Sequence, residues 1–291
     1  MSTFQPSAKS RFRRLRRLVL VLGSVMVLGV MLRLLDLHSA QPAAALSLSL
    51  ADASSFSTVI EPLSALRAEE SCTFDQSLML INAQYRLPDD FSPELCEIGD
   101  SGVWVNCCYA DAYTAAKNAV REKFDNALYI MSAYRSAEEQ AETKKQEGDT
   151  AAAVGASEHQ AGLAADVYVP YYAGMGFLNC PEGKFIQENC WRYGLIVRYP
   201  AYGEKQTGIA YEPWHLRYVG FPHAEIIMQQ RITLETYLSS LVPGNFYVYG
   251  SFLISRQPIG ETLTVPVSYR TMTISPDNMG YYILTCAMDA S

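Results

Sequence analysis

Hydrophobic residues recur every three or four positions over residues 110–124, which is the spacing of one buried face of an α-helix. These positions are Tyr113, Ala116, Val120 and Phe124. A second helix is predicted to begin after Ser136 and to run to about Glu147, because Ser136 and Glu139 have the spacing of a capping box. Further helices are expected over residues 184–193, 222–230 and 234–241.

Short runs of apolar and β-branched residues lie between these helices and predict strands. The runs cover residues 78–82, 128–132, 163–169, 195–199 and 214–219. Because the strands do not alternate regularly with long crossover helices, the pattern favours an α+β fold over a doubly wound parallel sheet. We therefore predict a small antiparallel sheet with flanking helices as one domain over residues 72–242.

The pattern changes after Pro243 and Gly244. Residues 246–254, 262–274 and 281–286 are rich in β-branched and aromatic side chains and predict strands, and residues 275–280 are a turn cluster. An antiparallel hairpin or meander of this size is only marginally stable alone. The segment 243–291 is therefore predicted to be a β-rich extension that packs on the main domain or on a partner.

The N-terminus is basic and then apolar. Six Lys or Arg residues within 9–17 precede an apolar segment over residues 18–35, in which Arg33 is the charged residue. The pattern predicts a transmembrane anchor at 18–35, with residues 1–17 as a basic cytoplasmic flank and the rest of the chain outside. A cleaved signal peptide is the alternative, because the Ala-rich residues 41–46 resemble a processing site.

The segment that follows, residues 36–71, lacks strong patterning and is predicted to be a linker, part helical near residues 59–70. The net charge of the whole chain is −7, but residues 34–291 carry 16 cations against 30 acids. An acidic body argues against a nucleic-acid partner, which requires a basic surface. Charge gives no positive indication of the substrate.

Seven cysteines fit an oxidising compartment, and their odd number leaves at least one unpaired or bonded to another chain. Cys180 and Cys190 bracket a short segment containing Pro and Gly and are the preferred intramolecular pair. The chain has no Cys-x-x-Cys, which argues against a thiolate zinc site. The adjacent Cys107 and Cys108 are interpreted as structural, because nothing near them in sequence resembles a base.

Two of the four histidines lie in short motifs with acidic residues. Residues 157–166 read SEHQAGLAAD, and an Asp in such an apolar run is costly to bury unless it is paired or bound to a cation. Two imidazoles and one carboxylate suffice to bind zinc and leave a fourth position for water. His159, Asp166 and His215 are thus candidate ligands. The alternative for the first motif is an Asp hydrogen-bonded to backbone beside a surface His.

The second motif, residues 212–218, reads EPWHLRY and adds a candidate base, Glu212, that can take a proton from water. Pro213 keeps Glu212 out of a helix, and in an extended segment residues three apart point to opposite faces. A bend at Pro213 is therefore required before Glu212 and His215 reach one ion. The alternative is a packing segment anchored by Trp214, with an incidental His.

Three motifs in this order resemble the VanY-type D-alanyl-D-alanine carboxypeptidases, zinc peptidases of the bacterial cell wall. They are residues 132–136 (SAYRS), 157–166 and 211–220 (YEPWHLRYVG). The likeness extends from about Leu78 to Leu241 and includes the connector 193–200 (YGLIVRYP). The predicted membrane segment and the β-rich extension lie outside it.

The resemblance implies one Zn²⁺ per chain, bound by His159, Asp166 and His215, with Glu212 as catalytic base. It also implies that Arg135 lies near the substrate carbonyl, where a guanidinium can stabilise an oxyanion. The predicted α+β domain is thus expected to be built around the zinc site.

Three further residues are candidates for substrate binding. Ser157 and Gln140 lie in or near the motifs, although Ser157 fits a turn equally well. Trp214 is interpreted as a wall of the pocket or part of the core. His223, just after Pro222, is expected at a helix start without a metal role.

These observations lead to the hypothesis of a zinc carboxypeptidase that hydrolyses the terminal D-Ala-D-Ala bond of peptidoglycan stem peptides or precursors. We expect it in the bacterial cell membrane with an extracytoplasmic catalytic domain, or secreted after signal cleavage. The nearest alternative is an L,D-carboxypeptidase or an endopeptidase with the same site, because specificity lies in the pocket walls. A non-catalytic peptidoglycan-binding module is disfavoured, since a binder has no need of Glu212.

Overall fold

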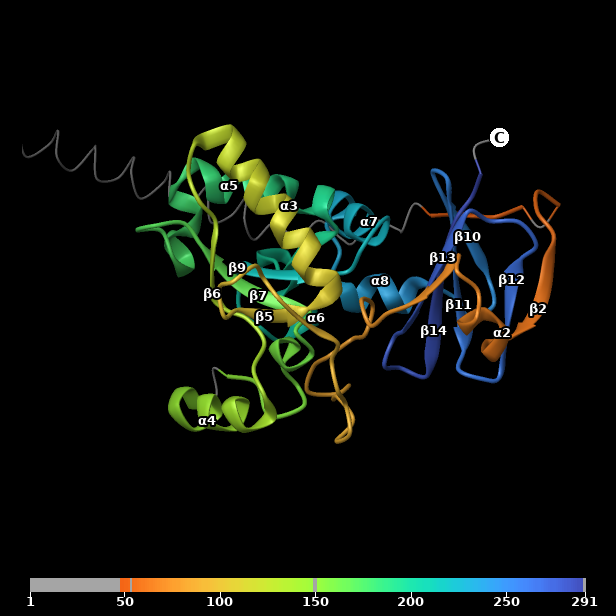
Figure 1. The fold of residues 1–291 in the computed structure, drawn as a ribbon, viewed down its shortest axis with the longest axis horizontal. Coiled ribbons are helices and arrows are strands. Elements are labelled where there is room, and N and C mark those ends of the chain that lie inside the picture. Colours follow the sequence, from red (N-terminus) through yellow and green to blue (C-terminus); the bar gives the residue numbers. More distant parts are fainter. Residues whose placement is uncertain (1–47, 53, 149–150, 290–291) are drawn as a thin grey trace, which may run out of the picture. The chain divides into compact units, whose positions relative to one another are not determined.

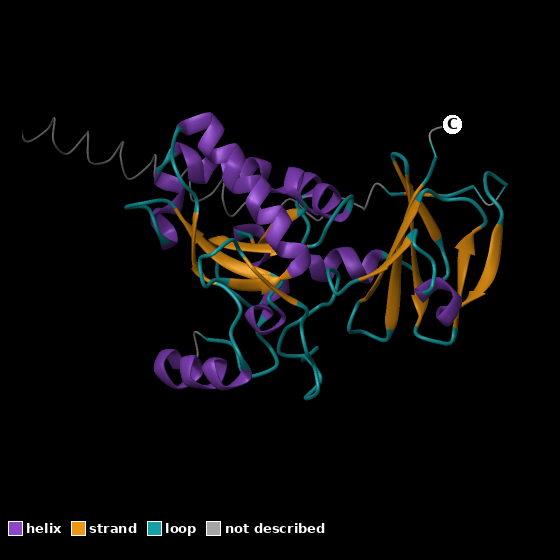
Figure 2. Ribbon diagram, viewed as in Figure 1, coloured by secondary structure: helices purple, strands orange, loops and turns teal. Residues whose placement is uncertain are grey.

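The computed structural model describes residues 48–52, 54–148 and 151–289. These residues belong to one compact unit that mixes helices and several sheets (Figure 1, Figure 2). The segment 18–35, predicted to be a membrane anchor or signal segment, lies outside the described residues. Within the described part of the chain, none of the helices combines the length and the apolar character needed to span a bilayer.

The predicted small antiparallel sheet is present, with four strands in the order β6-β7-β9-β8. The strands are β6 (Tyr129–Ser132), β7 (Ala164–Tyr168), β8 (Leu195–Tyr199) and β9 (Glu212–Tyr218). All three pairings are antiparallel. Because β7 and β9 are the inner strands, each is held by neighbours on both edges, and this firmly specifies which residues face each other.

Helices pack on this sheet and complete its core. α3 (Cys107–Phe124) buries Tyr109, Ala116 and Val120 in a cluster that also contains Val167 of β7. This is the amphipathic helix predicted from the spacing of apolar residues, and it begins at Cys107 rather than Ala110. The other helices of this part are α4 (Ala137–Glu147), α5 (Pro181–Asn189), α6 (Glu204–Thr207), α7 (His223–Gln230) and α8 (Leu234–Ser240).

The capping box predicted at the start of α4 is confirmed. Ser136 Oγ accepts a hydrogen bond from Glu139 N at 3.2 Å, and Glu139 Oε2 accepts one from Ser136 N at 2.8 Å. These bonds satisfy backbone donors that would otherwise lack a partner at a helix start. They fix the first turn of α4.

Residues 78–82, predicted to be a strand, form a buried loop instead. Leu78, Leu80 and Ile81 are buried, but the backbone of this loop is not part of a β-sheet. Leu80 N donates to Asp277 O at 3.1 Å. The prediction was wrong because a short apolar run indicates burial without specifying the backbone conformation.

The β-rich extension predicted over residues 243–291 forms most of a six-stranded sheet of order β1-β10-β11-β14-β13-β3. Its strands in this sheet are β10 (Phe246–Tyr249), β11 (Phe252–Pro258), β13 (Thr271–Pro276) and β14 (Tyr281–Ala287). The remaining strand, β12 (Thr262–Pro266), belongs to a separate two-stranded sheet. Two of the three predicted strands are therefore split by turns.

The described part of the predicted linker, residues 48–52 and 54–71, belongs to this same β structure, and residues 36–47 lie outside the described residues. β1 (Ser49–Leu50) pairs with β10, β2 (Thr58–Pro62) pairs with β12, and α2 (Leu63–Arg67) follows β2. β3 (Cys72–Phe74) then pairs in parallel with β13. The linker prediction is wrong for these strands, because their partner strands lie about 200 positions away and such pairing leaves little local pattern. The helix expected near residues 59–70 is present as α2.

The extension packs on the main domain, as predicted. Tyr247, Ile254 and Ile283 share one apolar cluster with Ile227 and Tyr237 of the helices. A polar contact crosses the same boundary, because the Nε2 atom of His223 lies 2.8 Å from Thr285 Oγ1 of β14. His223 is the first residue of α7, as expected for a helix start.

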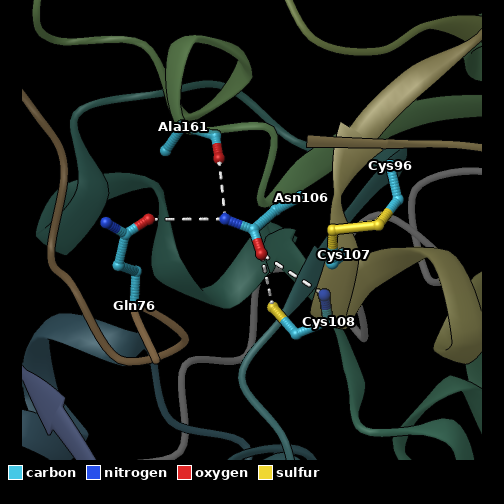
Figure 3. The surroundings of a disulfide bond; sticks show 6 residues. All are labelled: Gln76, Cys96, Asn106, Cys107, Cys108 and Ala161. Atoms are coloured by element: carbon cyan, nitrogen blue, oxygen red, sulfur yellow. Dashed lines mark hydrogen bonds between the residues drawn. A yellow bond between two sulfur atoms is a disulfide. The ribbon is translucent and has the colours of Figure 1, made fainter. Parts of the chain in front are cut away.

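One disulfide joins Cys96 to Cys107 in the described chain (Figure 3). It ties β4 (Leu95–Glu97), which pairs with β5 (Trp104–Asn106), to the first residue of α3. The predicted Cys180–Cys190 pair is wrong, since both are buried free thiols. Cys180 instead caps α5, where its Sγ accepts a hydrogen bond from Gly183 N at 3.3 Å.

Candidate active site

The predicted site residues line one cavity of about 420 Å³. The cavity lies where β6, β7 and β9 meet the 3-10 helix η2 (Glu158–Ala161) and the start of α4. The eight predicted residues that line it are Arg135, Gln140, Ser157, His159, Asp166, Glu212, Trp214 and His215. Segments separated by about 80 positions in sequence therefore converge on one space.

His159 lies in η2, and a turn at Gly162 connects η2 to β7. Its Nδ1 lies 2.8 Å from the carbonyl oxygen of Ala133, so Nδ1–H donates there and Nε2 faces the cavity side. The turn depends on Gly162, which has φ of 65° and whose added Cβ would lie 2.5 Å from Asn106 N. Only glycine fits this left-handed backbone and this close approach.

Asp166 and His215 are directly opposite each other on β7 and β9. Asp166 Oδ1 lies 2.9 Å from His215 Nδ1, and Asp166 Oδ2 lies 3.4 Å from His159 Nε2. One ligand atom from each of the three side chains lies within 4.8 Å of the others. The isolated Asp in an apolar run is thus paired with both imidazoles.

The bend required at Pro213 is present as an irregularity of β9. Val197 faces Leu216 and Tyr199 faces Glu212, so one residue of β8 lies opposite three residues of β9. Such a bulge redirects side chains that a regular strand would place on opposite faces. As a result, Glu212 Oε2 lies 3.8 Å from His215 Nδ1.

The charges of the site follow from burial and from this pairing. Burial alone would raise the pKa of Asp166, but its contacts with the two imidazoles prevail and lower it well below its usual range. Burial opposes charge on His215, but its contacts with Asp166 and Glu158 raise its pKa to about 9. Burial also raises the pKa of the Glu212 carboxyl and lowers that of His159.

The geometry of the three side chains fits a zinc ion. Ligand atoms of a tetrahedral zinc site with bonds of about 2.0–2.1 Å are roughly 3.3 Å apart. The separations of 2.9 and 3.4 Å, each to a different oxygen of Asp166, lie on either side of that value, and one ligand atom from each residue lies within 4.8 Å of the others. Two imidazole nitrogens and one carboxylate oxygen are also the ligand types of catalytic zinc sites, which keep a further position for water or substrate.

Arg135 adds the positive charge that lines the cavity. Its backbone N donates to His159 O at 3.1 Å, which ties the start of α4 to the His159 turn. Its Nε is buried and has no hydrogen-bond partner among the described residues. Burial lowers the pKa of the guanidinium, and the nearby Asp166 opposes this effect. The arginine is thus an electrostatic neighbour of the cluster.

The three residues predicted to bind substrate differ in how free their side chains are. Gln140 Nε2 donates to Ala152 O at 2.8 Å, while its Oε1 is buried without a partner among the described residues. Ser157 is buried at the cavity wall. Trp214 is half-buried and packs against the core cluster, which fits a wall of the pocket.

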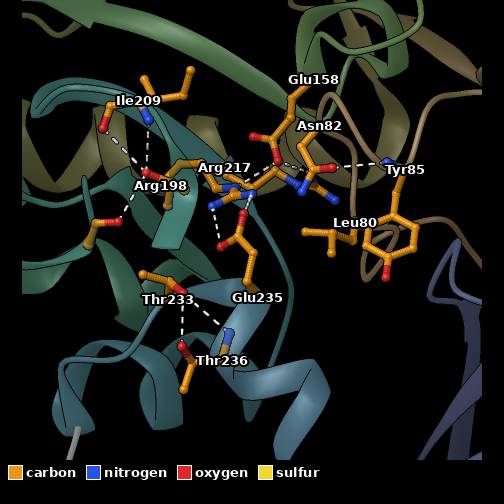
Figure 4. A network of polar contacts seen from close by, with 12 residues as sticks. Leu80, Asn82, Tyr85, Glu158, Arg198, Ile209, Arg217, Thr233, Glu235 and Thr236 are labelled. Atoms are coloured by element: carbon orange, nitrogen blue, oxygen red, sulfur yellow. Dashed lines mark hydrogen bonds and ion pairs between the residues drawn. The ribbon is translucent and has the colours of Figure 1, made fainter. Parts of the chain in front are cut away.

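One residue of the site, Glu158, was missed by sequence reasoning. It is 1% exposed and its Oε1 accepts hydrogen bonds from Arg198 Nε at 2.7 Å and Arg217 Nη1 at 2.6 Å (Figure 4). Arg198 also pairs with Glu235 at 2.6 Å. A signal was present, because an arginine is the next-to-last residue of each of the strands β8 and β9, and a buried arginine requires an acidic partner.

Comparisons with known proteins agree with this site. The family model described as "VanY: D-alanyl-D-alanine carboxypeptidase" matches residues 105–221. A D-alanyl-D-alanine carboxypeptidase of Enterococcus faecium is 30% identical over 231 residues, which are 74% of this chain and 73% of that relative. These matches indicate a family of carboxypeptidases. More narrowly, the chain belongs to the VanY family of D-alanyl-D-alanine carboxypeptidases.

Solved structures show the same fold. The vancomycin-resistance D,D-dipeptidase VanXYg aligns with a TM-score of 0.65 at 23% identity, over 79% of this chain and 98% of that one. The LD-carboxypeptidase LdcB aligns with a TM-score of 0.51 at 33% identity, over 55% and 85% of the two chains. The VanXYg alignment is longer than residues 72–242, so it extends into the flanking β structure.

Proposed function

We propose that the protein is a zinc-dependent carboxypeptidase that hydrolyses the terminal D-Ala-D-Ala bond of peptidoglycan stem peptides or precursors. The observation that carries the proposal is the convergence of His159, Asp166 and His215 within 4.8 Å in a cavity that Glu212 and Arg135 also line. The name of the Enterococcus faecium relative supports D,D-specificity.

His159, Asp166 and His215 are the proposed ligands of the zinc ion. The chemistry that zinc supplies in such a site is polarisation of a carbonyl and a lower pKa for water. Asp166 contributes the negative charge of this set, and its contacts with both imidazoles hold them at the spacing that the ion requires. His159 is oriented by Ala133 O, which leaves Nε2 as its binding atom.

Glu212 is the proposed catalytic base. Its carboxylate accepts a proton from the attacking water and returns it to the leaving amine. Arg135 donates hydrogen bonds to the oxygen of the scissile carbonyl as negative charge develops on it. Its buried Nε, which lacks a partner among the described residues, is available for such a bond. Ser157, Gln140 and Trp214 form the proposed walls of the substrate site.

The proposal is tested with the purified full chain, by measuring zinc content and the products formed from defined stem peptides. We expect about one zinc per chain and release of one D-Ala from a pentapeptide that ends in D-Ala-D-Ala, detected by mass spectrometry. The same peptide ending in D-Ala-L-Ala is the control and is expected to remain intact. A zinc-loaded chain that released no amino acid from the first peptide would refute the proposal.

A second candidate is L,D-carboxypeptidase activity, which the likeness to LdcB favours. It needs the same zinc, base and arginine, so the two activities differ only in what the cavity walls accept. A tetrapeptide with a single terminal D-Ala decides between them, because only an L,D-carboxypeptidase shortens it to a tripeptide. Peptidoglycan endopeptidase activity is recognised by cleavage of cross-linked peptides in the same assay. A binding module would hold each peptide without cleaving it.

We further propose that the catalytic domain, residues 72–242, acts outside the cytoplasm. Support comes from the Cys96–Cys107 disulfide, which is typical of oxidising compartments, and from the basic flank before residues 18–35. If residues 18–35 are a membrane anchor, we expect the protein to stay in membranes after a carbonate wash. If they belong to a cleaved signal peptide, we expect the protein to be released from the membrane and to have a lower mass.

A further inference from the structure

A buried ion cluster lies directly behind the proposed metal site. Glu158 and Arg217 are 1% and 0% exposed, and Arg198 is 1% exposed. Glu158 Oε1 contacts both guanidinium groups, and Glu235 neutralises the far side of Arg198. Arg217 also donates to the carbonyl oxygens of Ser77 and Met79, at 3.0 and 2.8 Å. The position of the Glu158 carboxylate is therefore fixed from several sides.

The second oxygen of Glu158 faces the imidazole of His215. Glu158 Oε2 lies 3.5 Å from His215 Nε2. Both atoms are buried, and neither has a hydrogen-bond partner among the described residues. Buried polar atoms are almost always paired, so a small movement that shortens this contact satisfies both at once. The two unsatisfied atoms point to a hydrogen bond between them.

The other nitrogen of His215 faces the proposed metal ligands and the base. Nδ1 lies 2.9 Å from Asp166 Oδ1 and 3.8 Å from Glu212 Oε2. A neutral imidazole that offers the Nδ1 lone pair to a cation carries its proton on Nε2. That proton then points at Glu158. Tyr199 and His159 pack against the ring, with centroids 4.8 and 5.0 Å away, and so restrict its rotation.

We propose that Glu158 is a positioning residue, which accepts a hydrogen bond from His215 Nε2–H and so directs His215 Nδ1 at the metal. Arg198 and Arg217 keep this carboxylate charged and in place. The proposal rests on the metal site of the proposed function, but it assigns a role to a residue outside that site's ligands and base. Metal-binding histidines commonly donate their second N–H to such a carboxylate, and its loss typically costs 10–100-fold in metal affinity.

The test compares two variants of the same ion cluster in the full chain. Glu158→Asp keeps the charge between the arginines but withdraws it from His215 by about one C–C bond, ~1.5 Å. Glu235→Gln removes the other carboxylate bound to Arg198 and is the matched control. Zinc dissociation constants are measured by chelator competition, and thermal unfolding of the metal-free proteins reports on folding. We expect Glu158→Asp to weaken zinc binding about 10–100-fold and Glu235→Gln to leave it unchanged.

A second measurement uses the unaltered protein, in case Glu158→Asp does not fold. Long-range proton–nitrogen NMR of the zinc-loaded chain is expected to show the His215 proton on Nε2, protected from exchange with water. Where Glu158→Asp folds, this proton resonance is expected to move upfield as the hydrogen bond weakens.

The outcomes separate the two proposals. A His215 proton found on Nδ1, or equal zinc affinity in wild type and Glu158→Asp, would overturn the positioning role and leave the zinc enzyme intact. Equal losses in both variants would also overturn it, since they would mark a general effect of the ion cluster. A wild-type chain that bound no zinc would overturn the proposed function together with the positioning role.

Discussion

Asp166 lies directly opposite His215 on neighbouring antiparallel strands, with 2.9 Å between Oδ1 and Nδ1. The separation of these two atoms is therefore set by the register of β7 and β9. A slip of one residue would turn one of the two side chains to the other face of the sheet. The antiparallel sheet and the proposed zinc site are thus specified by the same backbone pairing.

Replacing Asp166 with Asn tests the charge at the centre of this arrangement. Asp166→Asn keeps the size of the side chain but removes the carboxylate that contacts both imidazoles. We expect zinc affinity to fall by more than the ~10–100-fold that is typical of residues behind the ligands. Chelator competition measures the change. Asp111→Asn, an exposed site on α3, is the control and is expected to bind zinc normally. Stoichiometric zinc of wild-type affinity in Asp166→Asn would exclude this aspartate as a ligand.

Replacing Glu212 with Gln separates proton transfer from metal binding. Glu212→Gln retains the shape of the side chain, and His159, Asp166 and His215 remain in place to hold zinc. We expect normal zinc content and a kcat lower by about 10²–10⁴, the contribution of a general acid–base group. The measurement is D-Ala release at saturating peptide, with the exposed Glu122→Gln as control. Wild-type kcat in Glu212→Gln would assign the base elsewhere.

Much of the catalytic unit is readable from sequence because its signals are local. The capping box at Ser136 and the apolar spacing of α3 each involve residues a few positions apart. The bend at Pro213 was also foreseeable, because Glu212 and His215 cannot share a face of a regular strand. The structural form of this bend is an irregular pairing of β9 with β8, and β8 lies outside the motif 212–218, so the motif alone could not predict it.

The rest depends on partners that are distant in sequence. β1 and β2 exist because β10 and β12 pair with them, and residues 49–62 alone give little sign of it. The disulfide involves Cys107, whose partner Cys96 faces it only once β4 and β5 have paired. Glu158 was passed over because its two arginines lie 40 and 59 positions away.

The Cys96–Cys107 disulfide is expected to stabilise the protein by restricting the unfolded chain. It closes a loop over a sequence separation of 11 residues, for which chain entropy gives about 3 kcal/mol. We expect a reductant to lower the free energy of unfolding of the wild type by about that amount, as measured by denaturant titration. The double variant Cys96→Ala/Cys107→Ala is the control, since its stability should not respond to reductant. A wild type that is equally stable with and without reductant would contradict the prediction.

The buried His223 is expected to make stability depend on pH below neutrality. Burial lowers its pKa from 6.5 to about 3, and its ring contacts the hydroxyls of Tyr237 and Thr285. Between about pH 6.5 and 3 the unfolded chain binds a proton at this position that the folded chain excludes. The free energy of unfolding therefore falls as the pH falls through this window, by up to ~1.4 kcal/mol per pH unit.

The variant His223→Gln isolates this effect from the carboxylates that titrate in the same range. Gln cannot take up a proton, but its amide can still bond to one or both hydroxyls. We expect the variant to be less stable at pH 7 and to lose less stability between pH 6.5 and 4 than the wild type. Denaturant titrations of both proteins at each pH measure the difference. Because all other titrating groups are shared, equal losses in the two proteins would show that His223 is not buried in its neutral form.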